Sequence, residues 1–139
     1  MTTWLLDTGP LVAYLDAGDR HHGAVSAAWD DFRGRFVTTS AVVTEAMHFV
    51  SPARQGPRVL SDLITACQID VFDLCRPPEI GEATTLMERY ADTPMDFADA
   101  TLVLLSEALE IADILTLDRR GFSTYRTRQG KALRMVLDG

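Results

Sequence analysis

Cysteine is scarce in this sequence. Its 139 residues include two cysteines, Cys67 and Cys75, and neither belongs to a Cys-x-x-Cys pair or to a group with the spacing of zinc ligands. This scarcity excludes a small scaffold held by disulfides and a cysteine-based zinc site. Both cysteines lie in apolar stretches, so we expect them to be reduced residues of the core.

Long apolar runs and targeting signals are missing as well. No run approaches the roughly 18–20 residues that a membrane-spanning helix needs, and the N-terminus lacks the basic segment of a secretory signal. We therefore expect a cytoplasmic protein with no membrane partner. Internal repeats, low-complexity tracts and Ser/Gly-rich linkers are absent too, which predicts a single domain over residues 1–139.

Basic residues are in the minority. Thirteen lysines and arginines stand against twenty acidic residues, and the net charge of −7 argues against a protein that coats nucleic acid or anionic membrane by bulk attraction. The charge is uneven: residues 1–118 carry seven arginines and nineteen acids, net −12, whereas residues 119–139 carry six basic residues and one acid, net +5. Any anionic partner must therefore bind at a local site.

Short apolar tracts indicate the strands of a buried parallel sheet. Continuous apolar runs of this kind suit strands that are covered on both faces. Five candidates occur, at residues 3–6, 36–38, 69–72, 113–117 and 135–137.

Stretches with helical spacing lie between these strands. Gly9-Pro10 can open a helix over 11–15, and Ser40 can cap a helix over 41–50. Two prolines precede a helix over 79–90, a long apolar helix follows Asp96 and runs to Leu109, and residues 51–57 are punctuated as a loop. Strands that alternate with helices imply right-handed crossovers. We therefore predict an α/β fold, a three-layer α/β/α sandwich around a central, mainly parallel sheet of about five strands.

Two carboxylates directly follow predicted strands. Asp7 comes after the first strand and Asp118 after the fourth. Open α/β sheets bind ligands beyond the carboxyl ends of their strands, so acids at these positions are candidates for chemistry. The structural alternative for Asp7 is a turn former or helix N-cap, a common role of aspartate.

Three further acids belong to apolar helices. Glu45 has apolar neighbours at helical spacing, and an unpaired carboxylate on the inner face of such a helix is costly. Asp96 and Asp99 are three residues apart, and two close carboxylates need solvent, a proton, an arginine or a metal between them. The structural alternatives are an exposed or arginine-paired Glu45 and a favourable placement of the two aspartates at a helix N-terminus.

Together these acids come from four segments that can converge above one sheet edge. Hard oxygen ligands with no soft ligand nearby suit Mg²⁺ or Mn²⁺ rather than zinc. A cation held there would dock a phosphate, polarise it and generate hydroxide, as in metal-assisted hydrolysis. It would also let a net-negative protein engage an anion.

The same motifs resemble those of a known family. They are Leu6-Asp7-Thr8-Gly9-Pro10, the pair Thr44-Glu45 within an apolar helix, Asp96-Phe97-Ala98-Asp99-Ala100, and Leu115-Thr116-Leu117-Asp118 followed by Arg119-Arg120-Gly121-Phe122. In order and spacing across nearly the whole chain, they resemble the PIN-domain ribonucleases and, among these, the VapC toxins of bacterial toxin–antitoxin pairs.

The resemblance implies a metal-dependent endoribonuclease that uses Mg²⁺ or Mn²⁺, usually forms a homodimer and is inhibited by a small antitoxin. It assigns the four catalytic acids to Asp7, Glu45, Asp99 and Asp118, with Asp96 as a further metal ligand beside Asp99. Thr8 and Thr116 become supporting residues, and Thr116 can orient a metal-bound water. A fifth acid that the family often carries just before Phe122 is replaced here by Gly121.

The basic C-terminal run is a candidate RNA-binding segment. Its cations can hold backbone phosphates and its aromatic side chain can stack on a base, although a solvated surface or contact with an acidic partner is an equal alternative. The RNA-binding candidates are Arg119, Arg120, Tyr125, Arg126 and Arg128, with Lys131 and Arg134 in the same run.

Other functions remain open at this point. A phospho-receiver domain with Asp73 as the acceptor is similar in size and class but lacks the expected acidic pair after the first strand. A di-iron site is suggested by Glu45-Ala46-Met47-His48, yet a second Glu-x-x-His unit is missing, and the pair His21-His22 is expected to be exposed. A PIN-domain nuclease of RNA processing and a binding module without activity are the remaining alternatives.

Two apolar stripes are ambiguous between core and interface. They surround Val25, Trp29 and Phe32 in one segment and Val59, Leu60 and Leu63 in another. Such stripes can serve as dimer or antitoxin surfaces, but core burial is their commoner fate.

Overall fold

A computed structural model describes residues 1–138 and contains a five-stranded sheet in which all strand pairs are parallel. The prediction for Gly139, as part of a single domain, lies outside the described residues. The strands stand in the order β3-β2-β1-β4-β5. They are β1 (Thr3–Leu6), β2 (Arg35–Thr39), β3 (Asp70–Phe72), β4 (Asp113–Leu115) and β5 (Arg134–Met135).

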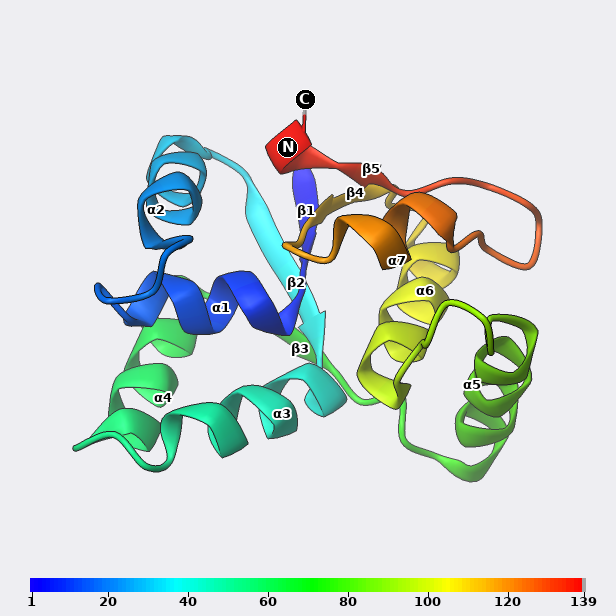
Figure 1. Cartoon of the computed structure of the whole chain (residues 1–139), viewed down its shortest axis with the longest axis horizontal. Helices are drawn as coiled ribbons and strands as arrows, with labels where there is room; N and C mark the ends of the chain where they lie inside the picture. Colours follow the sequence, from blue (N-terminus) through cyan, green and yellow to red (C-terminus); the bar gives the residue numbers. More distant parts are fainter. Residues whose placement is uncertain (139) are drawn as a thin grey trace.

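Helices cover both faces of this sheet. In Figure 1, α1, α2 and α4 lie to one side of the strands and α5, α6 and α7 to the other, while α3 passes beneath the carboxyl ends of β1 and β2. The predicted three-layer α/β/α sandwich is confirmed. The helices are α1 (Thr8–Leu15), α2 (His22–Asp31), α3 (Ser40–Val50), α4 (Gly56–Ala66), α5 (Pro77–Arg89), α6 (Phe97–Leu109) and α7 (Arg119–Thr124).

Several predicted boundaries shift by a few residues. The last strand was predicted over 135–137, but residues Val136–Asp138 form a 3₁₀ helix, η1, because β5 has partners on β4 only as far as Met135. Ser40 is the first residue of α3 rather than its cap, since the Thr39 hydroxyl accepts the N–H of Val42 instead. The fourth strand ends at Leu115, two residues early.

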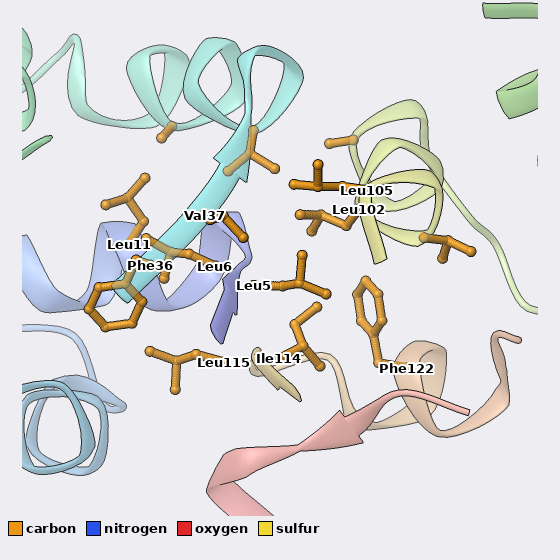
Figure 2. Packing of buried hydrophobic residues seen from close by; sticks show 14 of the residues in the cluster. Leu5, Leu6, Leu11, Phe36, Val37, Leu102, Leu105, Ile114, Leu115 and Phe122 are labelled. Atoms are coloured by element: carbon orange, nitrogen blue, oxygen red, sulfur yellow. The ribbon is translucent and has the colours of Figure 1, made fainter. Parts of the chain in front are cut away.

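Alternating side chains explain why the strands are apolar throughout. Figure 2 shows Leu5 and Ile114 pointing toward α6 and Phe122, whereas Leu6 and Leu115 point to the opposite face. All of these side chains are fully buried. Period-two alternation with both faces covered therefore produces the continuous apolar runs of the sequence.

Aromatic rings fill the amino-terminal end of one layer. Trp4 stacks on Phe32 with ring centroids 3.8 Å apart, and Trp29 stacks on Tyr14 at 4.3 Å. Trp29 and Val25 are buried and Phe32 is half-buried, as is Leu63 on α4, while Leu60 is fully buried. Both ambiguous stripes are thus mainly core, with Val59 left 44% exposed.

The two cysteines are reduced but not part of the core. Cys67 is exposed at the C-cap of α4, and Cys75 is exposed in the segment before α5. The prediction of buried cysteines was wrong because Cys67 lies where α4 ends in a turn and Cys75 lies in the irregular segment between β3 and α5.

Strand order places a crevice next to β1. From β1 the chain moves outward to β2 and β3, and then returns to build β4 and β5 on the other side. The carboxyl ends of β1 and β4 therefore flank the point at which the topology reverses, where α/β sheets bind their ligands. The backbone N–H of Asp7 continues the pairing by donating to Leu115 O at 3.1 Å.

None of the helices within residues 1–138 has the length and apolar character needed to cross a membrane.

Matched leucines on α6 test the packing of the core. Leu102 is fully buried against the sheet, whereas Leu109 ends the same helix at 36% exposure. We expect Leu102→Ala to lower the free energy of unfolding by about 2–5 kcal/mol and Leu109→Ala by less than about 1 kcal/mol. Urea denaturation measures both, and equal losses would contradict the described packing.

Candidate functional site

All five predicted acids line one cavity at the carboxyl edge of the sheet. The cavity has a volume of about 640 Å³. Asp7 and Asp118 come from the ends of β1 and β4, Glu45 from α3, and Asp96 and Asp99 from the start of α6. Its other lining residues are Thr8, Gly9, Val12, Asp19, Phe49, Pro94 and Leu117. Segments more than a hundred residues apart thus meet in one acidic pocket.

Asp7 is the most deeply buried of these acids, at 7% exposure. It caps α1, and its Oδ1 accepts the N–H of Thr8 at 2.8 Å, so the structural alternative and the predicted site role apply to the same residue. Burial raises the pKa of Asp7 to about 6, although the hydrogen bonds from Thr116 and Thr8 oppose this shift.

Thr116 connects the two central strands at the pocket. Its hydroxyl donates to Asp7 Oδ2 at 2.7 Å and accepts the backbone N–H of Asp118 at 3.0 Å. The hydroxyl is buried and is engaged by protein groups on both sides. Thr116 therefore positions two acids, which differs from the predicted role of orienting a water directly.

Asp96 and Asp99 form a capping box at the start of α6. Asp96 Oδ1 accepts the N–H of Asp99 at 2.7 Å, and Asp99 Oδ2 accepts the N–H of Asp96 at 3.1 Å. One oxygen of each carboxylate is thus held by the backbone and the other is left for the pocket. Burial, with the charges of Asp7 and Asp96, raises the pKa of Asp99 to about 8.

Glu45 approaches the same pocket from the second turn of α3. It is half-buried, and burial and the nearby carboxylate of Asp96 raise its pKa, although a hydrogen bond with the Thr8 side chain opposes this shift. Phe49, one turn further along the same helix face, also lines the pocket and is 59% exposed.

Asp118 caps the short helix α7. Its Oδ1 accepts the N–H of Gly121 at 3.0 Å. A Cβ on Gly121 would lie 2.3 Å from Asp118 Oδ2, so any side chain at this position would displace the fourth acid. Packing around the Asp118 carboxylate explains why this chain has glycine where a fifth acid was expected.

Tyr125 is not available to stack on a base. Its ring is fully buried against Phe122 and Tyr90, and its hydroxyl donates to Pro94 O at 2.8 Å. The prediction that Tyr125 stacks on a base was wrong. The sequence alone does not distinguish an exposed aromatic residue among arginines from one that packs beneath them. Here the tyrosine supports the segment that leads into Asp96.

Many arginines of the basic C-terminal run are paired with acidic residues of the chain. Arg119 pairs with Asp138 at 3.0 Å, and Arg134 pairs with Asp113 at 2.8 Å. Arg128 contacts Glu107 at 2.6 Å, and Arg126 donates to backbone carbonyl groups. The segment therefore offers an RNA less free positive charge than its composition indicates, and binding by its arginines stays a prediction.

Asp19 and Phe49 are among the pocket residues that were not singled out from the sequence. Asp19 is in a loop whose only sequence signal is polarity, and its Oδ1 accepts the N–H of His21. Phe49 was read only as an apolar neighbour of Glu45, although its position four residues later places both on one helix face. Asp73, the alternative phospho-acceptor, is exposed beyond the edge strand β3 and does not line this pocket.

The pocket has the chemistry of a cation site. Its donors are carboxylate and hydroxyl oxygens, and neither lysine nor arginine is among its lining residues. A divalent cation would offset the burial of charge and the repulsion between carboxylates that together raise the pKa of Asp7 and Asp99. In residues 1–138, no three acidic, histidine or cysteine side chains are already arranged around a common ion position. The residues present fit Mg²⁺ or Mn²⁺.

Stability without a metal should fall as the pH rises from 5 to 8. A carboxyl group with a raised pKa binds more protons in the folded than in the unfolded chain, so ionisation favours unfolding. In EDTA, we expect Asp99→Asn to gain melting temperature relative to the parent as the pH rises, and Mn²⁺ to reverse the gain. Differential scanning fluorimetry measures it, with the exposed Asp62→Asn as control. A constant difference between Asp99→Asn and the parent would contradict the electrostatic account.

The Thr116 hydroxyl should keep the Asp7 carboxyl group acidic. We expect Thr116→Val to raise the pKa of Asp7 further above 6, because the hydrogen bond stabilises the charged form. Thr116→Ser should restore the parent value. Carboxyl ¹³C shifts followed by NMR through a pH titration measure the change, and an unchanged titration in Thr116→Val would remove the assigned role.

Known proteins share this architecture and sequence over most of the chain. The PIN domain family profile matches residues 4–127. Ribonuclease VapC26 of Mycobacterium tuberculosis (strain ATCC 25618 / H37Rv) is 33% identical over 124 residues, which cover 88% of this chain and 91% of the relative. The crystal structure of Mycobacterium tuberculosis VapC20, described as a toxin that cleaves the sarcin–ricin loop, has a TM-score of 0.76 at 18% identity. The structural match covers 85% of this chain and 91% of the VapC20 chain.

The structural match is too low in identity to show more than a shared fold. The family profile and the sequence relative go further, because the profile spans the segments from β1 to α7 that supply the acidic pocket and the relative matches 88% of the chain at 33% identity. The chain therefore belongs to the PIN-domain family and, within it, to the VapC ribonucleases.

Proposed function

We propose that this chain is a divalent-metal-dependent endoribonuclease, the toxin of a toxin–antitoxin pair, and that it cuts RNA at the acidic pocket. The observation that carries the proposal is the meeting of Asp7, Glu45, Asp96, Asp99 and Asp118 around one cavity at the reversal point of the sheet. Nucleases of this family generally depend on a divalent metal.

Asp7, Asp96, Asp99 and Asp118 would hold the cation. Mg²⁺ or Mn²⁺, when bound there, would supply the polarisation of the phosphodiester and the activation of water that the carboxylates alone lack. In the reaction water adds to phosphorus, one P–O ester bond breaks, and the leaving oxygen takes a proton. Glu45 completes the acidic wall of the pocket.

The protein's own contribution is to hold the acids in place before substrate arrives. Thr8 N–H and the Thr116 hydroxyl restrain both oxygens of Asp7, and the capping box restrains Asp96 and Asp99. Burial excludes competing water from Asp7 and strengthens its interaction with any cation. Such preorganisation is the main source of catalysis in phosphoryl transfer.

The partners follow from the same proposal. RNA is the substrate, since the sequence relative is a ribonuclease and the structural relative is a toxin that cleaves an RNA loop. A small antitoxin and a second copy of the chain are the protein partners expected of a VapC toxin. An RNA-processing nuclease outside any toxin pair would use the same pocket and remains the alternative.

Cleavage assays on total bacterial RNA test the proposal. We expect Asp7→Asn and Asp99→Asn each to lower the cleavage rate about a hundredfold or more, because each removes a charged oxygen donor from the cation. The cleavage rate of Asp96→Asn, compared with that of Asp99→Asn, shows how much each of the two aspartates contributes to metal binding. EDTA should abolish cleavage and Mn²⁺ restore it.

Asp73→Asn is the matched control, since this aspartate also follows a strand but lies outside the pocket. Cleavage that persists undiminished in Asp7→Asn and Asp99→Asn would overturn the assignment of the site. Labelling of Asp73 by acetyl phosphate would favour the phospho-receiver alternative instead.

A further inference from the structure

Phe49 is a large aromatic side chain that the core does not use. The face of α3 that packs into the core carries Val42, Ala46 and Val50, which are all buried. Phe49 lies on the neighbouring line of the helix, one turn after Glu45, and is 59% exposed. It is also the one aromatic residue among those that line the acidic pocket. Its ring therefore contributes little to folding and is accessible beside the candidate site.

The exposed ring borders two cavities at once. Phe49 and Val12 line the acidic pocket, and both also line a second cavity of about 260 Å³, which we call the side pocket. The side pocket is formed where α3 packs against both α1 and α4 (Figure 1). Its walls are mainly apolar and include Leu15 from α1 and the 44% exposed Val59 from α4. An apolar hollow is thus continuous with the acidic one.

Hydrogen bonds and close packing fix the rim of the side pocket. In the turn between α3 and α4, the N–H of Ala53 donates to Val50 O and the N–H of Gly56 donates to Ala53 O, each at 3.0 Å. Gly56 approaches Val50 O so closely that a Cβ would not fit there. The cavity is therefore part of the fold.

One cation borders the side pocket. Arg54 is exposed on the turn between α3 and α4, and none of the ion pairs within residues 1–138 includes it. In contrast, three arginines of the C-terminal run are paired with acids. Asp16, the acid of this lining, has one oxygen engaged by the N–H of Gly18 at 2.9 Å. Arg54 therefore offers an anion a positive charge close to the acidic pocket.

A nucleotide suits these three features together. Unpaired nucleobases stack on aromatic side chains and bury apolar surface, and arginine pairs with phosphate. An apolar protein segment would fill the hollow but would leave Arg54 without an anion. The Cα atoms of Glu45 and Phe49 are about 6 Å apart along an α-helix, so a strand held at the acids reaches the ring within one nucleotide.

We propose that Phe49 stacks on the nucleobase next to the phosphate that is cut, so that this base enters the side pocket, and that Arg54 pairs with a neighbouring phosphate. The inference rests on the proposed function and adds to it a residue that selects the substrate without binding the metal. A base stacked inside a duplex cannot reach the ring, so the bond that is cut must lie beside an unpaired base.

Cleavage of a synthetic RNA that carries the bond cut by the parent tests the contact. We expect Phe49→Ala to lower kcat/KM about tenfold or more, mainly through KM, and Phe49→Trp to keep the parent value. Melting temperature and manganese affinity should stay at the parent values, because the ring is exposed and is not a metal ligand. Ile80→Ala, which truncates a 43% exposed side chain on α5, is the matched control.

An abasic nucleotide distinguishes stacking from a structural effect. Removal of the base on one side of the cut bond should cost the parent about as much in kcat/KM as Phe49→Ala does. In Phe49→Ala the same abasic RNA should lose no more than about twofold further, because the contact is already gone. Fully additive losses at both neighbouring positions overturn the stacking.

Salt dependence tests the arginine. Arg54→Ala should reduce the slope of log KM against log salt concentration by about 0.7, the value for one phosphate of a single strand. Arg89→Ala removes an equally exposed charge from α5 and should leave the slope unchanged. An unchanged slope in Arg54→Ala overturns its contact with phosphate.

The remaining outcomes separate the occupants of the side pocket. A parent protein that cuts no RNA overturns the proposed function, whereas a cutting parent with parent-like kcat/KM in Phe49→Ala overturns this inference alone. In that second case, sedimentation of Phe49→Ala identifies the alternative. A dissociated dimer assigns the side pocket to a second copy of the chain, and an unchanged sedimentation coefficient leaves a different protein partner as its occupant.

Discussion

A carboxylate buried at the end of the central strand determines the electrostatics of the rest of the site. Asp7 sits between the strands of the sheet and the first turn of α1, where its charge is poorly solvated. Two donors, Thr8 N–H and Thr116 Oγ1, hold it in place without neutralising it. The charge of Asp7 therefore remains costly in free energy, and each further acid of the site adds to that cost. A bound cation relieves this cost, so the pocket favours a cation.

The same cluster of carboxylates lowers the stability of the free protein while it keeps a position open for the metal. Three carboxylates meet at Asp7, Asp96 and Asp99, and the fold keeps them together by means of backbone N–H groups rather than basic side chains. An arginine in the pocket would stabilise the free protein but would occupy the position of the metal. The sequence instead places its arginines away from the cavity, where Arg128 and Arg134 pair with acids of the body.

Much of the fold and of the acid set follows from local patterns. The strand tracts are apolar because both sheet faces are covered, and Asp7 and Asp118 follow strands, so topology alone brings them together. Features that depend on contacts between segments distant in sequence were not predicted. Tyr125 is predicted to stack on a base, but its hydroxyl donates to Pro94 O within the fold. Asp19 reaches the pocket from a loop that carries no periodic signal.

The distance in sequence between the two central strands also has a consequence for synthesis. β4 pairs with β1 only after more than a hundred intervening residues have been made, and Thr116 and Asp118 lie in the last fifth of the chain. A growing chain on the ribosome therefore contains Asp7 long before Thr116, whose hydroxyl holds Asp7, and Asp118 have been added. Long-range pairing of this kind forms late in folding. The acidic pocket is therefore incomplete until the last fifth of the chain has been made.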